Sequence, residues 1–413
     1  MSPRPEFVIV GAGLAGAKAA EALRGEDFDG RITLLGDEAH RPYERPPLSK
    51  DYLQGSAERD SVFAHPQNWY PDNDVELQLD DPVTGLDPGD HRLTTGGGRT
   101  VRYDKLLLAT GSSPRRLPVP GSDLGGVHYL RTLDDSERLR ARLLPGARIV
   151  VIGGGWIGLE TAAAARGAAA EVTVLESAEL PLLGVLGPRI AQVFADLHTA
   201  HGVDLRCGAG VTEIRARPDD SSTAGAVLLA DGSVIEADTV VVGIGITPND
   251  GLARAAGLTV DNGIMVDEHL RTSDPDIVAA GDVANAYHPL LGRHVRVEHW
   301  ANALNQPAVA AVTMLGRSAT FDRLPYFFTD QYDLGMEYTG YAAPGGYDDV
   351  VVRGDLAGRE FIAFWLADRR PVAAMNVNVW DVTEALGGLI RSGAQVDTAR
   401  LADGDVPLDA VSG

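Results

Sequence analysis

Two glycine-rich stretches have the residue types and spacing that bind a diphosphate. The first is Gly11-x-Gly13-x-x-Gly16, which follows the apolar run 7–10 and precedes an alanine-rich helical pattern. In such a strand–turn–helix unit, the first glycine allows the tight turn and the second lets the backbone approach a pyrophosphate. The third lets the helix pack closely on the strand. Because amide groups at the helix N-terminus attract phosphate charge, this stretch predicts a dinucleotide site.

The same fingerprint recurs later in the chain as Gly153, Gly155 and Gly158, directly after the apolar run 148–152. The next predicted strand ends at Glu176, and no basic residue follows it closely. A carboxylate at this place accepts from ribose hydroxyls and repels a 2′-phosphate. The chain should therefore bind two dinucleotides, and the second should be NADH rather than NADPH.

Further stretches also read as buried strands that end in a turn. One reaches Ala-Thr-Gly111 and another reaches Gly-Asp282. The strand 31–36 of the first unit is followed by Asp37 and Glu38, where a carboxylate can accept from an adenosine ribose hydroxyl. Strands that alternate with helical patterns in this way predict an α/β fold built on parallel sheets.

Length and composition limit the classes of protein that the chain can form. With 413 residues and 44% hydrophobic content, it has enough apolar material for several domains. Its net charge of −22 opposes binding to nucleic acid and to anionic membranes. No apolar run approaches the roughly 20 residues that cross a bilayer, and no export signal follows Met1. We therefore expect a cytoplasmic protein that binds neither nucleic acid nor membrane.

The chain contains a single cysteine, Cys207. One thiol cannot form an internal disulfide, a redox dithiol pair, or a cysteine-held zinc or iron-sulphur site. The histidines include no His-x-x-x-His or Glu-x-x-His pair. We therefore expect no metal site, and any iron that takes part in the chemistry should belong to another protein.

Narrower motifs accompany the glycine fingerprints. They are Arg-Pro-Tyr-Glu-Arg-Pro-Pro-Leu-Ser-Lys at 41–50, Tyr-Leu-Arg at 129–131, Glu-His-Trp-Ala-Asn-Ala at 298–303 and Asp-Gln-Tyr at 330–332. Together with the Ala-Thr-Gly and Gly-Asp motifs, they resemble the FAD- and NADH-dependent ferredoxin reductases. This family serves putidaredoxin, rhodocoxin and aromatic dioxygenase systems, and it belongs to the glutathione-reductase-like two-dinucleotide-binding flavoproteins. The resemblance covers nearly the whole chain.

The resemblance implies an architecture of two Rossmann-like domains and a third domain. An FAD-binding domain would comprise residues 1–112 and 246–320. The NADH-binding domain, residues 113–245, would be inserted into it. A C-terminal α+β domain would follow at 321–413.

The resemblance also implies a function, that of a ferredoxin--NAD(+) reductase with FAD and NADH as cofactors. Such a flavoprotein passes hydride from NADH to FAD, and then single electrons to a [2Fe-2S] ferredoxin. That ferredoxin would feed a haem-thiolate monooxygenase or a Rieske dioxygenase, and the reductase would be a monomer or homodimer. The alternative is an NADH oxidase, or another NADH-dependent flavin oxidoreductase with a non-ferredoxin acceptor.

Family contacts can be carried over to matching positions of this chain. The expected FAD contacts are Gly11, Gly13, Gly16, Asp37, Lys50, Val83, Arg131, Asp282 and Trp300, and the expected NADH contacts are Gly153, Gly155, Gly158 and Glu176.

Two departures from the family concern the surface that would meet the electron acceptor. Pro307 should interrupt the helix that starts near Trp300, because proline lacks the amide donor. Phe328 stands where relatives often have tryptophan.

Lys50, Glu160 and Trp156 are the candidate catalytic residues. Only Lys18, Lys50 and Lys105 are lysines among 36 basic residues, so a retained ammonium at 50 could favour electron arrival at the flavin. The alternative for Lys50 is a plain surface lysine. Glu160 could pair with Lys50 across the two nucleotide domains, beside the nicotinamide site, or could serve only the helix dipole in the first turn. Trp156 could stack on the flavin and move aside for nicotinamide, or could simply pack in the wall.

The sequence lacks the residues that other enzymes of this fold need for their chemistry. Peroxide and disulfide reductases, like NADH oxidases, need a redox cysteine near the flavin, and 41–50 contains none. A Baeyer–Villiger monooxygenase would carry a Phe-x-Gly-x-x-x-His motif, which the sequence lacks. The net negative charge argues against a non-catalytic, DNA-binding protein of this fold.

A docking surface for an acidic ferredoxin needs a local basic patch, because the chain as a whole is acidic. The available residues are Arg41, Arg45, Arg293 and Arg296, with the aromatic Trp380 of the third domain beside them. We expect the patch to form from these side chains.

Overall fold

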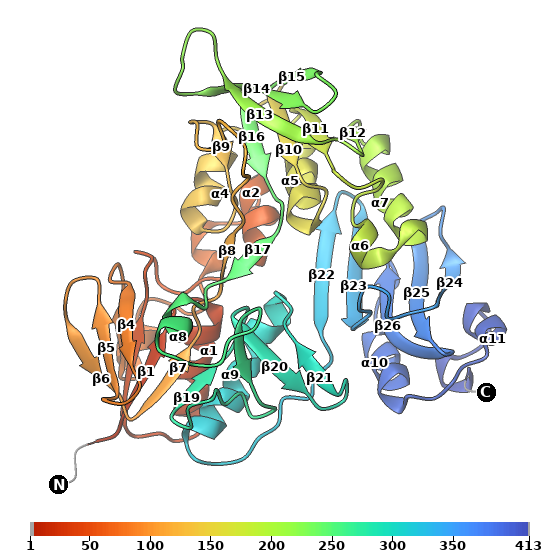
Figure 1. Ribbon diagram of the computed structural model, residues 1–413. Coiled ribbons are helices and arrows are strands. Elements are labelled where there is room, and N and C mark those ends of the chain that lie inside the picture. Colours follow the sequence, from red (N-terminus) through yellow and green to blue (C-terminus); the bar gives the residue numbers. More distant parts are fainter. Residues whose placement is uncertain (1–3, 412–413) are drawn as a thin grey trace. The chain divides into compact units, whose positions relative to one another are not determined.

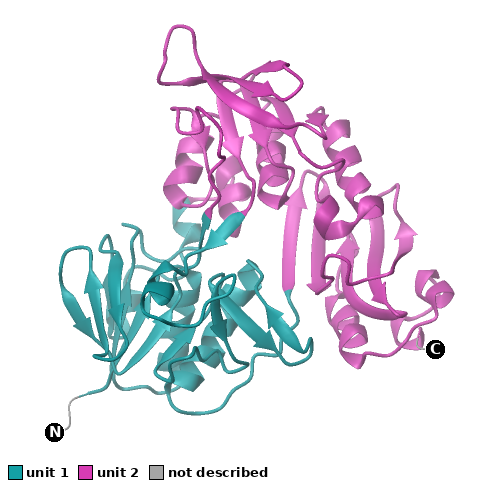
Figure 2. Ribbon diagram, in the orientation of Figure 1, with its two compact units in different colours: residues 1–44, 59–113, 246–325 teal, residues 45–58, 114–245, 326–413 magenta. Residues whose placement is uncertain are grey.

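The computed structural model describes residues 4–411 (Figure 1). The chain divides into two compact units (Figure 2). Unit 1 comprises residues 1–44, 59–113 and 246–325, and unit 2 comprises residues 45–58, 114–245 and 326–413. Each unit is therefore assembled from three separate stretches of the sequence.

Unit 1 is built on a five-stranded parallel sheet. Its order is β19 (Ile277–Ala279), β7 (Lys105–Leu108), β1 (Glu6–Val10), β2 (Arg31–Leu35) and β3 (Val75–Gln78). Strands β19, β7, β1 and β2 are short runs rich in Val, Ile and Leu that are largely buried, as expected when both faces of a parallel sheet are covered, whereas in the edge strand β3 only Val75 is buried. Helix α1 (Leu14–Gly25) packs against helix α9 (Trp300–Met314) in the same core.

Smaller elements complete unit 1. One antiparallel sheet contains β4 (Val83–Asp87), β5 (Arg92–Thr95) and β6 (Thr100–Arg102), and another sheet contains β18 (Ile264–Val266), β20 (Ala284–His288) and β21 (Arg293–Val295). The short helices are η2 (Arg59–Val62), α3 (Trp69–Asp72) and α8 (Gly251–Ala255). Strands β8 (Ser112–Pro114) and β17 (Ile246–Pro248) pair where the chain leaves unit 1 and returns to it.

Unit 2 contains a second five-stranded parallel sheet. Its order is β12 (Asp204–Arg206), β11 (Glu171–Leu175), β10 (Arg148–Ile152), β16 (Thr239–Val242) and β9 (Val127–His128). Four helices accompany it: α4 (Leu133–Arg140), α5 (Trp156–Gly167), α6 (Leu183–Leu186) and α7 (Pro188–Ala200). An antiparallel sheet of β13 (Val211–Ala216), β14 (Ala224–Leu229) and β15 (Val234–Glu236) follows α7 and β12 in the chain.

The C-terminal part of unit 2 is a five-stranded antiparallel sheet with helices. Its order is β22 (Tyr326–Gln331), β23 (Leu334–Gly340), β26 (Arg370–Val377), β25 (Glu360–Ala367) and β24 (Asp349–Asp355), followed by α10 (Thr383–Ser392), α11 (Thr398–Ala402) and η3 (Leu408–Ala410). The segment 45–58 supplies η1 (Pro46–Ser49) and α2 (Asp51–Gln54), which pack on α4 and α5. This packing brings the Pro-Pro-Leu-Ser-Lys motif into unit 2.

The predicted fold class is confirmed: two Rossmann-like parallel sheets precede an α+β C-terminal region. Residues 45–58 belong to unit 2. The family resemblance instead predicts that the FAD-binding domain includes every residue from 1 to 112. Among residues 4–411, no helix is long and apolar enough to cross a membrane.

The expected break at Pro307 does not occur, since α9 runs without interruption from Trp300 to Met314. Proline inside a helix costs about 3 kcal/mol, because it removes one backbone hydrogen bond and crowds the preceding turn. Pro307 is itself buried, as are Ala310 and Ala311, which pack in the core of unit 1. Burial of this face offsets the cost, and the helix continues.

Candidate active site

The two glycine loops have the same backbone geometry. The φ angle is +114° at Gly11 and +106° at Gly153, in the left-handed region that side chains rarely adopt. A Cβ built at Gly11 would lie 2.1 Å from the carbonyl oxygen of Ala109, and one at Gly153 would lie 2.4 Å from that of Gly243. Both positions require glycine, because the first strand of each unit passes close to a neighbouring strand end.

The later glycines of each loop also correspond. A Cβ at Gly16 or Gly158 would lie 2.1 or 2.0 Å from the carbonyl oxygen of the first glycine of its own loop. By contrast, Gly13 meets no described atom within 4 Å, and Gly155 meets only one, at 3.9 Å. In the described part of the chain, neither α1 nor α5 has a side-chain cap at its N-terminus. Each helix therefore begins beside open space, with backbone amides available to an anion.

Glu176 lies immediately after β11 and is fixed to the second glycine loop. Its Oε2 accepts from the backbone amide of Gly154 at 2.6 Å, and its Oε1 accepts from the amide of Ala178 at 2.7 Å. The corresponding position after β2 is Gly36, and Asp37 next to it is exposed. The two units therefore place these acidic residues differently, since Asp37 is exposed whereas the Glu176 carboxylate is tied to its glycine loop.

The other predicted flavin-binding residues lie in both units. Val83 begins β4, Asp282 follows β19, and Trp300 begins α9, all in unit 1. The Trp300 indole donates to Glu44 Oε2 at 3.2 Å. Arg131 belongs to unit 2, where its carbonyl oxygen accepts from the Arg45 guanidinium. Their contact with a flavin remains a prediction.

Lys50 and Glu160 form a buried ion pair within unit 2. The Lys50 Nζ lies 2.8 Å from Glu160 Oε1, and the two side chains are 12% and 3% exposed. Lys50 is therefore not the plain surface lysine of the alternative interpretation. Glu160 lies in the second turn of α5, and the first turn contains no acidic residue, so its expected role as a first-turn dipole partner is wrong.

Two hydroxyl groups complete the environment of the Glu160 carboxylate. Thr329 donates to Oε1 at 2.6 Å, and Ser49 donates to Oε2. Neither residue type is distinctive by itself, although Ser49 lies within the motif 41–50 and Thr329 directly precedes the Asp-Gln-Tyr motif. A buried carboxylate is tolerated only when its charge is paired and hydrogen-bonded, and these three donors meet that condition.

The surroundings of the pair include a second carboxyl group and an aromatic ring. Burial raises the pKa of Asp330, with the Glu160 charge adding to the rise and the Lys50 ammonium opposing it. The Lys50 Nζ also lies 5.5 Å from the centre of the Phe328 ring, within the range of a cation–π contact. The Lys50 ammonium is thus the local positive charge in an otherwise acidic and apolar environment.

Trp156 packs among aromatic side chains of unit 2. Its ring centre lies 5.4 Å from Phe194, edge to face, and 5.1 Å from Phe327. This packing agrees with the alternative in which Trp156 belongs to the wall. A contact between nicotinamide and the part of the Trp156 ring that these side chains leave uncovered remains a prediction.

Cys207 shows no sign of reactivity. It follows β12 and is half-buried, and burial raises the pKa of its thiol, with the Glu176 charge adding to the effect. Thiolate reactivity requires a lowered pKa. Within residues 4–411, no group of three or more His, Cys, Asp or Glu side chains is placed to hold a metal ion.

The expected basic patch is wrong in part. The Arg296 side chain is only 7% exposed and pairs with Glu298 at 2.7 Å. Arg41 lies over the Phe63 ring at 3.5 Å, so most of its surface is covered. Arg293 on β21 of unit 1 is exposed, and so is Trp380 of unit 2, and each by itself remains a candidate contact for an acceptor protein.

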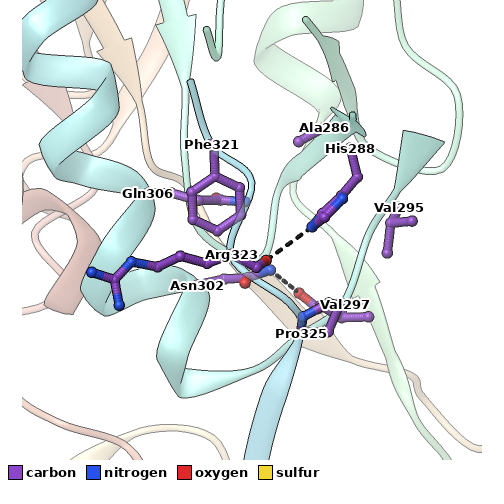
Figure 3. A pocket seen from close by; sticks show the side chains of 9 residues that line it. All are labelled: Ala286, His288, Val295, Val297, Asn302, Gln306, Phe321, Arg323 and Pro325. Atoms are coloured by element: carbon purple, nitrogen blue, oxygen red, sulfur yellow. Dashed lines mark hydrogen bonds between the residues drawn. The ribbon is translucent and has the colours of Figure 1, made fainter. Parts of the chain in front are cut away.

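A small cavity in unit 1 contains none of the predicted site residues (Figure 3). Its volume is about 10 Å³, room for about one water molecule. Two hydrogen bonds join residues of its lining: His288 Nε2 contacts the Arg323 carbonyl oxygen at 2.9 Å, and Asn302 donates to the Val297 carbonyl oxygen at 3.3 Å. The cavity is far too small for a nucleotide.

Comparisons with known proteins place this geometry in a family. Residues 5–306 match the pyridine nucleotide-disulphide oxidoreductase model, and residues 326–412 match the reductase C-terminal model. The chain belongs to the pyridine nucleotide-disulphide oxidoreductase family. Because the chain has one cysteine, its chemistry does not use an internal dithiol pair.

Individual relatives are similar over nearly the full length. The ferredoxin--NAD(+) reductase component of an anthranilate 1,2-dioxygenase system from Burkholderia cepacia is 44% identical over 411 residues, 99% of each chain. A rubredoxin-NAD(+) reductase from Pseudomonas putida is 38% identical over 385 residues, covering 93% of this chain and 99% of the relative. In the covalent putidaredoxin reductase–putidaredoxin complex, one chain is 39% identical with a TM-score of 0.95, covering 99% of this chain and 98% of that one. The predicted resemblance is thereby confirmed.

Proposed function

We propose that the chain is an FAD-dependent ferredoxin--NAD(+) reductase. One NADH and two oxidised ferredoxins would yield NAD⁺, one proton and two reduced ferredoxins. The observation that carries the proposal is the presence of two equivalent glycine cradles in a chain without a redox cysteine pair. Such a protein can hold two dinucleotides and has no internal dithiol as a next electron carrier, so the electrons must leave to a partner.

We assign the first cradle to FAD and the second to NADH. In this assignment, residues 1–112 and 246–320 form the FAD domain, 113–245 the NADH domain and 321–413 the C-terminal domain. Asp37, Val83, Arg131, Asp282 and Trp300 would contact FAD. The open space beside Gly13 and Gly155 fits a pyrophosphate in each cradle.

FAD, when bound, accepts a hydride from NADH and can release the two electrons singly. The protein residues supply orientation and charge. We propose that the Lys50 ammonium faces the reacting flavin edge and favours the charge that arrives there, and that Glu160 holds the ammonium in place. The NADH would enter beside Trp156 and be held by Glu176.

The proposal also concerns the identity of the electron acceptor. Relatives include reductases named for ferredoxin and for rubredoxin. We propose a [2Fe-2S] ferredoxin that serves an oxygenase, with the reductase acting in the cytoplasm as a monomer or homodimer. The alternative remains a flavin oxidoreductase with a non-ferredoxin acceptor.

Acceptor choice is tested by turnover of the purified, FAD-loaded protein with NADH. We expect a [2Fe-2S] ferredoxin to be reduced at least tenfold faster than oxygen, a rubredoxin or a disulfide, because a docked acceptor is held in place for electron transfer. Ferricyanide, which needs no docking surface, serves as the control for flavin reduction. Faster reduction of oxygen or of the disulfide would refute the ferredoxin assignment.

Nucleotide choice is tested at Glu176. Replacing Glu176 with Arg should narrow the preference for NADH over NADPH by about ten- to a hundredfold, because one repulsion is lost and one ion pair is gained. The measurement is kcat/KM for both nucleotides. The matched control is Glu171→Arg, since Glu171 lies exposed at the other end of β11. A wild-type protein that uses both nucleotides equally would contradict the role of Glu176.

A further inference from the structure

A continuous chain of hydrogen bonds connects the Glu160 carboxylate to the tip of the β22–β23 hairpin. Beyond Thr329, which donates to Glu160, the Gln331 Nε2 lies 3.2 Å from the Thr329 Oγ1. The Gln331 Oε1 lies 2.8 Å from His198 Nε2, and His198 Nδ1 lies 3.3 Å from the Tyr332 hydroxyl. All of these residues belong to unit 2.

The direction of every bond in this chain follows from the charge at one end. An ionised Glu160 can only accept, so the Thr329 hydroxyl must donate its single proton to it. The Thr329 oxygen is then left to accept from the Gln331 amide nitrogen, which turns the amide oxygen toward His198. His198 must therefore carry its proton on Nε2, and its Nδ1 must accept from the Tyr332 hydroxyl.

The interior of this hydrogen-bond chain is buried and uncharged. Thr329 and Gln331 are each 1% exposed, and His198 is fully buried. Burial lowers the pKa of His198 to about 4, so the imidazole is neutral at physiological pH. Burial also raises the pKa of Tyr332, so its hydroxyl keeps the proton that it donates.

The outer end is held in a strained conformation. Tyr332 has a φ of +56°, which a residue with a large side chain rarely adopts. Its ring stacks on His201 at 3.8 Å with an interplanar angle of 10°. His201 caps the end of α7, which also carries His198. Helix α7 and the hairpin therefore fix the Tyr332 hydroxyl toward the buried imidazole.

We propose that Thr329, Gln331, His198 and Tyr332 are positioning residues whose aligned hydrogen bonds hold the Glu160 carboxylate, and through it the Lys50 ammonium, in place for flavin reduction. Aligned bonds reinforce one another, and each directs its positive end toward Glu160. The chain is not a proton path, because the Gln331 amide has no second proton state that is readily reached. This inference rests on the proposed function for its kinetic consequence only.

The kinetic test uses the FAD-loaded protein and stopped-flow reduction by NADH. Thr329→Val keeps the shape but removes the hydroxyl, and we expect about a tenfold slower reduction at saturating NADH, the scale of one hydrogen bond to a charged group. NADH affinity should not change. Thr329→Ser should restore the rate, and Thr339→Val, at another buried threonine of the same sheet, should leave it unchanged. An unchanged rate in Thr329→Val would overturn the proposal.

A spectroscopic test does not depend on activity. In the FAD-loaded protein labelled with ¹⁵N-histidine, His198 should be found as the neutral Nε2–H tautomer at pH 7. Glu160→Gln should change the ¹⁵N shifts or the tautomer of His198, because the negative charge that sets the direction of the bonds is lost and an amide can also donate. Either of two results would overturn the proposed hydrogen-bond chain: an Nδ1–H tautomer of His198, or ¹⁵N shifts of His198 that are the same in Glu160→Gln as in the wild type. If the protein were not reduced by NADH but the expected tautomer were present, the proposed function would fail and the chain would stand.

Discussion

Lys50→Ala should slow reduction of the flavin by NADH by about a hundredfold, with little change in NADH affinity. The reason lies in the burial of the ion pair. Removing the ammonium takes away the positive charge proposed to stabilise the arriving electrons, and it leaves the Glu160 carboxylate buried with two hydroxyl donors but no counter-charge. Stopped-flow absorbance of the FAD-loaded variant measures the rate and the affinity separately.

Glu160→Gln should show a weaker form of the same defect. The amide keeps the shape and can still accept from Thr329, but it no longer attracts the ammonium. Lys18→Ala is the matched control, because Lys18 forms a lysine–glutamate pair of similar length with Glu21 at the surface. If Lys50→Ala were reduced as fast as the wild type, the Lys50–Glu160 pair would have no part in the chemistry.

The parts of the site that could be predicted from the sequence are those whose physics is local. A left-handed φ at Gly11 and a close approach at Gly16 involve only a strand, a turn and the next helix, so the spacing of the glycines is sufficient. The strand end at Glu176 follows from the same local pattern at the second glycine loop. The pairing of Lys50 with Glu160 could be predicted as one of two alternatives, because lysine is scarce in the chain and because Glu160 lies directly after the second glycine loop.

The remaining features depend on tertiary packing. Thr329 reaches Glu160 from strand β22, and His198 joins the same hydrogen-bond chain through Gln331 from helix α7, so the contacts join segments far apart in the sequence. Arg296 looks like a surface cation until the fold buries it against Glu298. Pro307 should end a helix, yet the packing of α9 in the core of unit 1 outweighs the lost hydrogen bond. Local rules cannot give these outcomes, because each is decided by contacts made after folding.

The buried His198 should make the stability of the protein depend on pH. Its pKa falls from the ordinary 6.5 to about 4 in the folded chain, because burial penalises the imidazolium. Between these values the unfolded chain binds more protons than the folded one, so the free energy of unfolding falls as the pH decreases from 6.5 to 4. The shift corresponds to about 3 kcal/mol, which is lost progressively over that window and is fully present above pH 6.5.

His198→Gln should remove this dependence while lowering stability at neutral pH, because glutamine cannot gain a proton yet leaves part of the cavity unfilled. The measurement is the difference in unfolding free energy between variant and wild type, from denaturant unfolding of the FAD-loaded proteins at several pH values. This difference should shift in favour of the variant by about 3 kcal/mol between pH 6.5 and 4. His294→Gln is the control, since His294 is exposed on β21. A difference that stays constant with pH would mean that His198 is not held neutral by the fold, and the polarity inferred for its hydrogen bonds would lose its basis.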